Sequence, residues 1–396
     1  MLTRSLGVCG TGGVALNREV KYVAFYSSGA VQSENRQSSP SAITKIDYIC
    51  SALRRNGVDV EIVSPSWTNN GKGVYRGGVY RVAEGVTLRT FRTFGAGNRL
   101  QRIVKYLYSL SQMCLYLLGT HKKGEPIIVY HSPILSLPIR LVQRVKRFEL
   151  ILEVEEIYQD VVACSRQAMR SEYRIFASAD KFILSTGLLN DKVNPGNKPN
   201  AVVHGVYRRE PDRKCGFDDD RIHVVYAGTF NPSKGAAAAA AAAAYLPTAH
   251  YHVHIIGFGN EAETERVRQQ VAEISRTSGC TVTYDGLLRG EEYIRFLQSC
   301  DIGLSTQIPD TTYNDTSFPS KILSYLANGL RVVSVRTRAI ESSAIGDVVF
   351  YYEEQTPRAI AEAIMSIDMR QPYDSTELMN RLDAEFVKSV KQLVCG

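Results

Sequence analysis

The chain has 396 residues, of which 44% are hydrophobic and 22% charged, and its formal net charge is +7. The composition is that of a globular protein, and the length exceeds what one hydrophobic core usually supports, so we expect two domains. No run of residues is apolar and long enough to cross a bilayer, and the first residues lack the apolar core of a signal peptide, so we expect a cytoplasmic protein.

The charge and the cysteines are distributed unevenly along the chain. Residues 1–206 hold 27 Lys and Arg against 15 Asp and Glu, whereas the remainder holds 20 against 25. A basic first half suggests an anionic partner such as a membrane surface, a phosphate-bearing substrate or a nucleic acid. The eight cysteines form no CxxC pair and no Cys/His cluster, so we expect reduced structural thiols and no metal site.

The first half alternates strands and helices. Strands are predicted at 20–28, 58–66, 126–132, 150–156, 181–186 and 197–207, and helices at 41–57, 98–118, 136–148 and 164–178. This βαβ alternation predicts a Rossmann-type parallel sheet in an N-terminal domain over residues 1–206.

A polar stretch over 207–221 is typical of a linker, and a second βαβ series follows it. We therefore expect a C-terminal Rossmann-like domain over 222–372 and a final helix near 374–394, within a segment 373–396 that packs back on the first domain. The predicted fold class is α/β, with two Rossmann-like domains facing a central cleft where ligands meet the carboxyl ends of the strands.

Nine consecutive alanines occupy a helix position of this second series. They follow the strand HVVYAGTF and the turn NPSKG and end before Pro247. Alanine has the highest helix propensity and a small side chain, so the run predicts a short buried helix that lies close to the sheet and is held by packing.

Two helix starts in this domain could receive a phosphate. Lys234 precedes the alanine helix, and Lys321 stands at the start of PSKILSYLANG, where Ser317 and Ser320 could cap, Pro319 suits the first turn and Gly329 ends the helix. Two such sites in one domain favour a diphosphate. The alternative is a pair of ordinary turns with solvated lysines.

Two glycines stand in HIIGFGN at a strand end. Gly257 and Gly259 would allow a ligand to approach the backbone closely, although a plain tight turn explains them equally well.

In this order, the segments VVYAGTFNPSKG, HIIGFGN, VTYDGLLRGEEYIRFLQSCDIGLST and SFPSKILSYLANGLRVVS resemble the nucleotide-sugar domain of glycosyltransferase family 4, retaining enzymes of GT-B architecture. The first half resembles that family's acceptor domain only through HSP at 131–133 and EVEEIYQD at 153–160.

The resemblance implies retaining, metal-independent transfer of a sugar from a nucleoside diphosphate sugar, with no cofactor beyond that substrate. The leaving diphosphate would itself accept the acceptor's proton. The donor-binding residues implied are Gly228, Thr229, Lys234, Gly257, Phe258, Gly259, Leu287, Asp315, Thr316, Ser317, Phe318, Pro319, Ser320, Lys321 and Ser324.

Three of these positions depart from the family. Thr229 stands where members carry an arginine on the diphosphate, and Thr316 and Ser324 stand where they carry two glutamates. Ser324 could still hydrogen-bond a ribose hydroxyl, and Asp315 could replace the first glutamate.

The acceptor site is expected at strand ends of the first half. The candidates are Gly29, His131, Glu153, Glu155, Glu156 and Tyr158. Clustered carboxylates could orient hydroxyl groups or act as a base, and the alternative is that they neutralise nearby arginines. His131 could contact the sugar, or be structural. With Lys234 and Lys321 on the diphosphate, His131 and Glu156 complete the candidate catalytic set.

Two basic amphipathic helices could lie on an anionic membrane. Their candidate membrane-facing residues are Arg99, Arg102, Lys105, Arg140, Arg144 and Arg147. The alternative is a solvated helix face over a core. Aromatic interleaving of the kind that binds single-stranded nucleic acid is absent, so no nucleic-acid partner is expected.

The predicted function is a retaining glycosyltransferase (a hexosyltransferase) that uses a UDP- or GDP-sugar and acts on a glycan or lipid-linked acceptor in surface polysaccharide biosynthesis, peripherally on the inner face of the plasma membrane. A first alternative is a catalytically degenerate subunit that partners an active glycosyltransferase. A second is a two-Rossmann epimerase of the nucleotide sugar.

Overall fold

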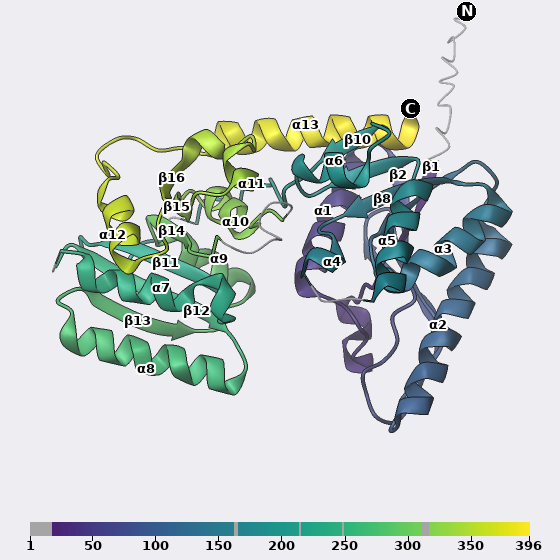
Figure 1. Cartoon of the computed structure of the whole chain (residues 1–396), viewed down its shortest axis with the longest axis horizontal. Coiled ribbons are helices and arrows are strands. Elements are labelled where there is room, and N and C mark those ends of the chain that lie inside the picture. Colours follow the sequence, from purple (N-terminus) through teal and green to yellow (C-terminus); the bar gives the residue numbers. More distant parts are fainter. Residues whose placement is uncertain (1–17, 162–164, 214, 248, 310–316) are drawn as a thin grey trace, which may run out of the picture.

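The computed structural model describes residues 18–161, 165–213, 215–247, 249–309 and 317–396. The described chain forms two α/β halves side by side, each around its own sheet, and one long C-terminal helix runs along both (Figure 1). The predicted class of two Rossmann-like domains is confirmed.

The first half is built on a sheet whose strand order is β10-β9-β8-β7-β1-β2-β5-β4, in which only β4 runs antiparallel to its neighbour. Its strands are β1 (Arg18–Val23), β2 (Val58–Ser64), β3 (Val74–Tyr75), β4 (Gly78–Ala83), β5 (Val86–Thr90), β6 (Thr93–Phe94), β7 (Pro126–Tyr130), β8 (Glu149–Val154), β9 (Lys181–Leu184) and β10 (Asn200–Val202). Its helices are α1 (Pro40–Arg55), α2 (Arg99–Thr120), α3 (Pro133–Lys146), α4 (Tyr158–Val161), α5 (Arg166–Ser178) and α6 (Leu188–Val193). The buried faces of α2, α3, α5 and α6 share one core, and α1 packs into another.

The second half is a wholly parallel sheet of order β13-β12-β11-β14-β15-β16, the doubly wound order in which the first strand of the series lies at the switch point. Its strands are β11 (Ile222–Thr229), β12 (Tyr251–Phe258), β13 (Thr281–Gly286), β14 (Ile302–Ser305), β15 (Arg331–Val335) and β16 (Val349–Tyr352). Its helices are α7 (Ala236–Ala242), α8 (Glu261–Thr277), α9 (Gly290–Gln298), α10 (Lys321–Ala327), α11 (Arg338–Glu341) and α12 (Pro357–Met365). The helices α7, α8 and α12 cover one face, and α9, α10 and α11 pack toward the other.

The alanine run forms the predicted buried helix. Ala239, Ala240, Ala242 and Ala243 are fully buried between the sheet and α8 and α12, and the run closes with a single 3-10 turn over Ala243–Tyr245. A methyl side chain at each of these positions lets the helix approach the sheet closely.

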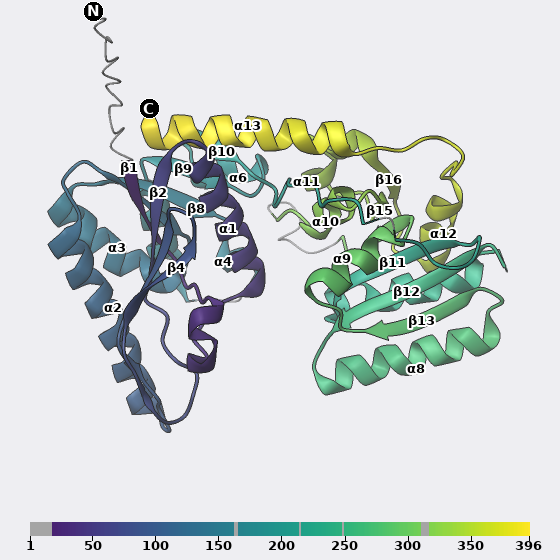
Figure 2. The ribbon, with the colours of Figure 1, turned by 180° about the vertical axis from the view of Figure 1, so that it is seen from behind.

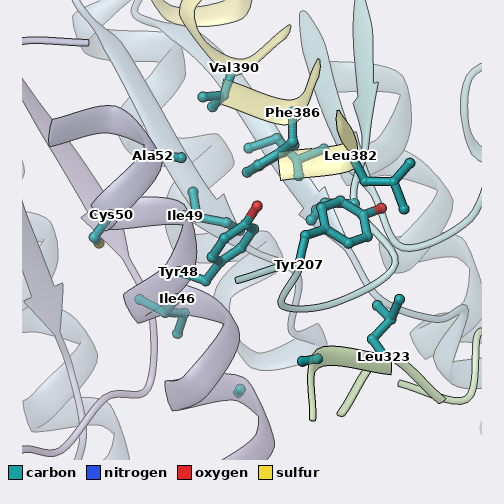
Figure 3. Packing of buried hydrophobic residues seen from close by; sticks show 14 of the residues in the cluster. Ile46, Tyr48, Ile49, Cys50, Ala52, Tyr207, Leu323, Leu382, Phe386 and Val390 are labelled. Carbon is teal, nitrogen blue, oxygen red and sulfur yellow. The ribbon is translucent and has the colours of Figure 1, made fainter. Parts of the chain in front are cut away.

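The last helix, α13 (Thr376–Cys395), contacts both halves. Seen from behind, it spans the top of the molecule from the second half to α1 and β10 (Figure 2). Figure 3 shows the resulting core, in which Tyr48 of α1 stacks on Phe386 of α13 at 5.5 Å and meets the linker residue Tyr207 edge-on at 6.1 Å. Leu323 of α10 joins the same cluster, so this core includes residues of both halves and of the linker.

Several elements were not predicted. The strands β3 to β6 form a hairpin-rich insert, in which the sequence predicted no strand. The reason is that β4 alternates between half-buried and exposed residues and lacks a strong apolar run. The elements α11, β16 and α12 were likewise not assigned.

Candidate active site

A cavity of about 990 Å³ lies between the two halves. Its first-half wall comes from residues around the start of α1 and from residues that follow β7, β8 and β9. Its second-half wall comes from α9 and the segment 317–328. The volume is at the upper end of ordinary ligand pockets, and the position matches the carboxyl-end crevice expected of parallel sheets.

Lys321 places a buried cation beside the second-half wall. Its Nζ is shielded from solvent, lies 4.2 Å from the ring centroid of Tyr226, and has no hydrogen-bond partner among the described residues. Burial, together with the charge of Lys234, lowers the Lys321 pKa to about 7. A buried ammonium group without an anion is costly, so this site favours an anionic ligand.

Gly228 makes room for that ammonium group. A Cβ at Gly228 would lie 3.1 Å from Lys321 Nζ, and Tyr226 fixes the turn beyond it by donating from its hydroxyl to the carbonyl groups of Thr229, at 2.8 Å, and Lys234, at 3.1 Å. Thr229 itself is exposed at the end of β11. The turn and the lysine are therefore held as one unit.

Lys234 is half-buried in a 3-10 turn, Pro232–Lys234, that Asn231 caps by accepting from Ser233 N at 3.0 Å. Lys234 does not line the cavity directly. Its charge adds to the lowering of the Lys321 pKa and opposes the rise of the Glu156 pKa, so Lys234 lies near both walls. The two predicted phosphate lysines are thus brought together.

The segment 317–324 follows the prediction in part. Ser317, Phe318, Ser320, Lys321 and Ser324 line the cavity, whereas Pro319 does not. Asp315 and Thr316 lie outside the described residues.

The predicted cap by Ser320 is wrong. The Ser320 side chain makes no capping hydrogen bond because its own backbone is already helical. The Tyr293 hydroxyl lies 3.3 Å from Ser324 Oγ and occupies part of that residue's hydrogen-bonding capacity. Gly329, with a φ of 85°, ends the helix as expected.

The glycines of HIIGFGN allow close packing within the second half. A Cβ at Gly257 would lie 1.8 Å from the Gly228 carbonyl oxygen, and one at Gly259 would meet Glu263 at 2.8 Å and Phe230 at 3.0 Å. The close approach at Gly257 is therefore between neighbouring strands, and its approach to a ligand stays a prediction. Phe258 and Leu287 are exposed at the ends of β12 and β13, outside the cavity lining.

The carboxylates after β8 form the opposite wall. Glu155 and Glu156 line the cavity, and Glu155 forms an ion pair with Lys45 of α1. Burial raises the pKa of Glu156, Glu155 raises it further, and Lys234 opposes them. Tyr158 also lines the cavity.

Glu153 lies beneath this wall and is fully buried, accepting a hydrogen bond from the Tyr22 hydroxyl. Burial raises its pKa to about 8, and Glu155 adds to the shift. Glu153 is placed to support the sheet and Glu155 rather than to touch a ligand.

His131 is not at the cavity surface. It is 1% exposed and packs against Tyr158 and Phe176, with Nε2 3.5 Å from a Glu172 oxygen. Burial lowers its pKa to about 4. The expectation that His131 faces the sugar therefore fails in this structure, because α4 and α5 cover the strand end.

Gly29 borders a separate hollow of about 420 Å³ near Asp47 and Arg81. The sequence reading also missed residues that do line the main cavity, among them Lys45, Trp67, His204 and Arg208. His204 is fixed by a 2.8 Å contact between its Nδ1 and the Ser185 carbonyl and stacks on Phe318 at 4.4 Å. Nothing in the linear sequence marks these residues, because none of them belongs to a recognised motif.

The predicted membrane-facing residues separate into two groups. Arg99, Arg102, Arg144 and Arg147 are exposed, and Arg140 is half-buried. Lys105 is only 3% exposed and donates to the Thr68 carbonyl at 2.6 Å, so its assignment to the membrane face is corrected. None of the described helices is long and apolar enough to span a bilayer.

Comparison with known proteins relates part of the chain to a protein family. Residues 221–367 match the model of the family "Glycosyl transferases group 1". No curated protein matches the chain.

Solved structures match almost the whole chain at low identity. Sucrose-phosphate synthase from Thermosynechococcus elongatus has a TM-score of 0.62 at 13% identity, with 95% of each chain covered. A trehalose-6-phosphate protein from E. coli bound with UDP-2-fluoro glucose has 0.61 at 11%, covering 94% of this chain and 95% of that one. HepE of Anabaena in complex with UDP has 0.60 at 11%, covering 96% and 98%.

These likenesses agree with the two facing Rossmann-like sheets, the cavity between them and the matched second domain. The protein has the GT-B fold, carries a group 1 glycosyl transferase domain at residues 221–367, and is a glycosyltransferase.

Proposed function

We propose that the enzyme is a retaining, metal-independent glycosyltransferase of the family 4 type that moves a sugar from a UDP- or GDP-sugar to a glycan or lipid-linked acceptor. The observation that carries the proposal is the buried Lys321 ammonium group beside the interdomain cavity, with the charge of Lys234 close to it. A diphosphate would supply a counter-charge to the buried Lys321 ammonium group and gain charge-assisted hydrogen bonds.

The two lysines also suit the transition state of such a transfer. Negative charge grows on the diphosphate as the sugar leaves, and fixed cations in a partly dry site stabilise it. With the diphosphate as proton acceptor, no protein nucleophile is needed on the sugar's other face.

The acceptor would approach from the first half. Glu155 and Glu156 line that wall and can accept hydrogen bonds from acceptor hydroxyl groups, and Lys45 holds Glu155 in place. This supports a hydroxyl-rich acceptor such as a glycan, and we place the reaction in surface polysaccharide assembly on the cytoplasmic side of the membrane.

The test is calorimetry of the full chain against UDP-, GDP- and dTDP-sugars, followed by product analysis with acceptor extracts in the presence and absence of EDTA. We expect binding of one donor class, turnover insensitive to EDTA, and retention of the anomeric configuration by NMR. Absence of binding to every donor contradicts the proposal. Donor binding without turnover indicates a degenerate partner subunit, and an isomerised nucleotide sugar indicates an epimerase.

We further propose that the first half rests on an anionic membrane through α2 and α3, which contact each other. Exposed apolar side chains gather on these two helices: Leu100, Ile103, Val104, Leu107, Leu115, Ile134, Leu137, Leu141 and Val145. Exposed arginines, among them Arg102 and Arg144, lie on the same helices. Apolar area with a basic rim is the pattern of a helix that lies in the lipid interface.

Vesicle flotation tests this membrane contact. In the double variant Leu107→Glu/Leu141→Glu we expect binding to vesicles with 30% phosphatidylglycerol to fall by at least about tenfold, since each buried leucine contributes about 1.5–3 kcal/mol. Met365→Glu, on α12 of the other half and 40% exposed, is the matched control and should bind as wild type. Equal binding by all three proteins would refute the membrane face.

A further inference from the structure

Three histidines lie together on the face of the second sheet toward α9, away from the cavity. His223 is the second residue of β11, and His252 and His254 alternate along β12, with His223 in register with His252. Among the described residues they form a group whose ring nitrogens can all lie within 4.8 Å of one another. Six residue steps, roughly 20 Å of strand, lead from His223 to Thr229 at the cleft end of β11.

Hydrogen-bond partners fix the proton on each ring. The Thr283 hydroxyl donates its one proton to Asp285 at 2.8 Å, so toward His252 Nε2, at 3.0 Å, the same oxygen can only accept. His252 therefore carries its proton on Nε2, and its buried Nδ1, which has no partner, holds a lone pair.

The other two rings are fixed by carboxylates. Asp285 lies 3.1 Å from His254 Nδ1, and Asp219 lies 2.9 Å from His223 Nε2, so these nitrogens carry the protons. In the neutral rings, His254 Nε2 and His223 Nδ1 then both hold lone pairs, and they face each other at 2.9 Å.

Two facing lone pairs repel each other, so this arrangement favours a cation, either a proton or a metal ion, beside them. Three inner nitrogen atoms present lone pairs, and each outer nitrogen is engaged by an oxygen acceptor. This is the outer arrangement that usually orients histidine ligands of a metal ion. Nitrogen ligands 2.0–2.1 Å from a zinc ion are roughly 3.3 Å apart at a tetrahedral angle, within a few tenths of an ångström of the observed pair.

The surrounding charges also suit a divalent ion. The carboxylates of Asp219, Asp285 and Asp301 stand near the rings, and Arg221, a nearby cation, directly precedes β11. Phe217 stacks on His223 and His254, at 4.0 and 4.9 Å, and limits access of water.

We propose that His223, His252 and His254 bind a zinc ion through Nδ1, Nδ1 and Nε2 respectively, with a water molecule in the fourth position. Imidazole is a preferred ligand of zinc, and three histidines with an open fourth position form a known type of zinc coordination. The site is structural: it joins β11 to β12 and, through Asp219 and Phe217, fixes the end of the linker on the second sheet. It is independent of the cleft chemistry, which is proposed to need no metal.

The test is zinc binding by the full chain after chelator treatment. We expect one zinc per chain by calorimetry and by elemental analysis after desalting, with a dissociation constant below about 1 µM, the range of strong histidine sites. At a hundredfold excess over that constant, the melting temperature of the second domain should rise by roughly 5–10 °C. Cobalt substituted for zinc should give the visible absorption of a nitrogen-ligated tetrahedral ion, a readout that needs no variant.

His252→Gln should weaken zinc binding by at least about 100-fold, because it removes one ligand. His250→Gln is the matched control, since His250 is exposed two residues away and outside the cluster. Donor binding should be the same with and without zinc, so failure of this site leaves the proposed function standing. No zinc bound at 100 µM, or equal binding by wild type and a folded His252→Gln, would overturn the proposal.

Discussion

Replacing Lys321 by methionine should weaken binding of the nucleotide sugar by roughly 10- to 150-fold, the effect of losing a charged hydrogen bond of about 1.5–3 kcal/mol. The same change should stabilise the protein in the absence of nucleotide, by roughly 1–2 kcal/mol, because it removes an unpaired buried cation and keeps the volume of the side chain. A residue with a purely structural role would shift stability in the opposite direction.

The pH dependence of donor binding is a further signature of Lys321. Its pKa is about 7 in the free protein, and an anionic ligand must raise it, so binding takes up a proton above pH 7. The affinity of the wild type for a nucleoside diphosphate should therefore fall from pH 7 to pH 9, by up to about tenfold per unit, and that of Lys321→Met should not.

The sign for stability follows from the same shift. Because the unfolded chain holds the proton up to about pH 10.5, it binds more protons than the folded chain between pH 7 and that value, and wild-type stability should rise with pH across this window. The advantage of Lys321→Met should be largest below pH 7. Urea unfolding at several pH values, with calorimetry against UDP, measures both effects.

Lys388→Met is the control for Lys321→Met, because Lys388 is exposed on α13 and far from the cavity wall. It should change neither affinity nor stability appreciably. An unchanged donor affinity in Lys321→Met would remove this residue from the site.

Gly235→Ala should have the largest effect on folding. Gly235 has a φ of 82°, and a Cβ there would lie 1.7 Å from the Thr306 carbonyl oxygen, which is backbone and cannot turn away. The left-handed conformation costs about 1–2 kcal/mol for a residue with a side chain, and the forced backbone shift adds roughly 1–3 kcal/mol. We expect a loss of about 2–5 kcal/mol in the free energy of unfolding, measured by urea denaturation.

Gly119→Ala is the matched control and should act in the opposite direction. Gly119 lies in α2, where a Cβ meets nothing within 4 Å, so the exchange should stabilise the helix by about 0.5–1 kcal/mol. A Gly235→Ala protein as stable as wild type would show that the turn before α7 is not held as the structure has it.

The sequence predicted the two sheets well because their strands are strong apolar runs in regular alternation with helices. The alanine helix followed for the same local reason, since helix propensity and the flanking turn agree. The insert β3 to β6 was not predicted because its strands are short and half-exposed. Their stability comes from pairing with other strands rather than from a local apolar pattern.

Only those residues of the candidate site that belong to local motifs could be predicted from the sequence. Lys234 and Lys321 were found from helix starts, but the burial of the Lys321 ammonium group depends on Gly228 and Tyr226 of β11, which are far from Lys321 in the sequence. His131 ends the right strand, yet α4 and α5 cover it, and periodicity cannot show such coverage. Lys105 shares a helix with exposed arginines but turns inward to a backbone carbonyl.

The histidine cluster was missed for a related reason. Alternate histidines at 252 and 254 place two rings on one face of a strand, which the sequence does show. Their partner, His223, is brought beside them only by the pairing of β11 with β12.

Helix α13 has a consequence for how the protein is made. Its start is tied to α10 by a hydrogen bond from Ser375 to the Leu326 carbonyl, and its end is held in the first half by Lys181, which donates to the Leu393 carbonyl at 2.7 Å. Residues 376–395 leave the ribosome after the whole second sheet, so the core between α1 and β10 stays open while most of the chain is being translated. Exposed Ile49 and Leu53 at that stage would be a natural target for chaperones, and the first half should complete its folding only after the second.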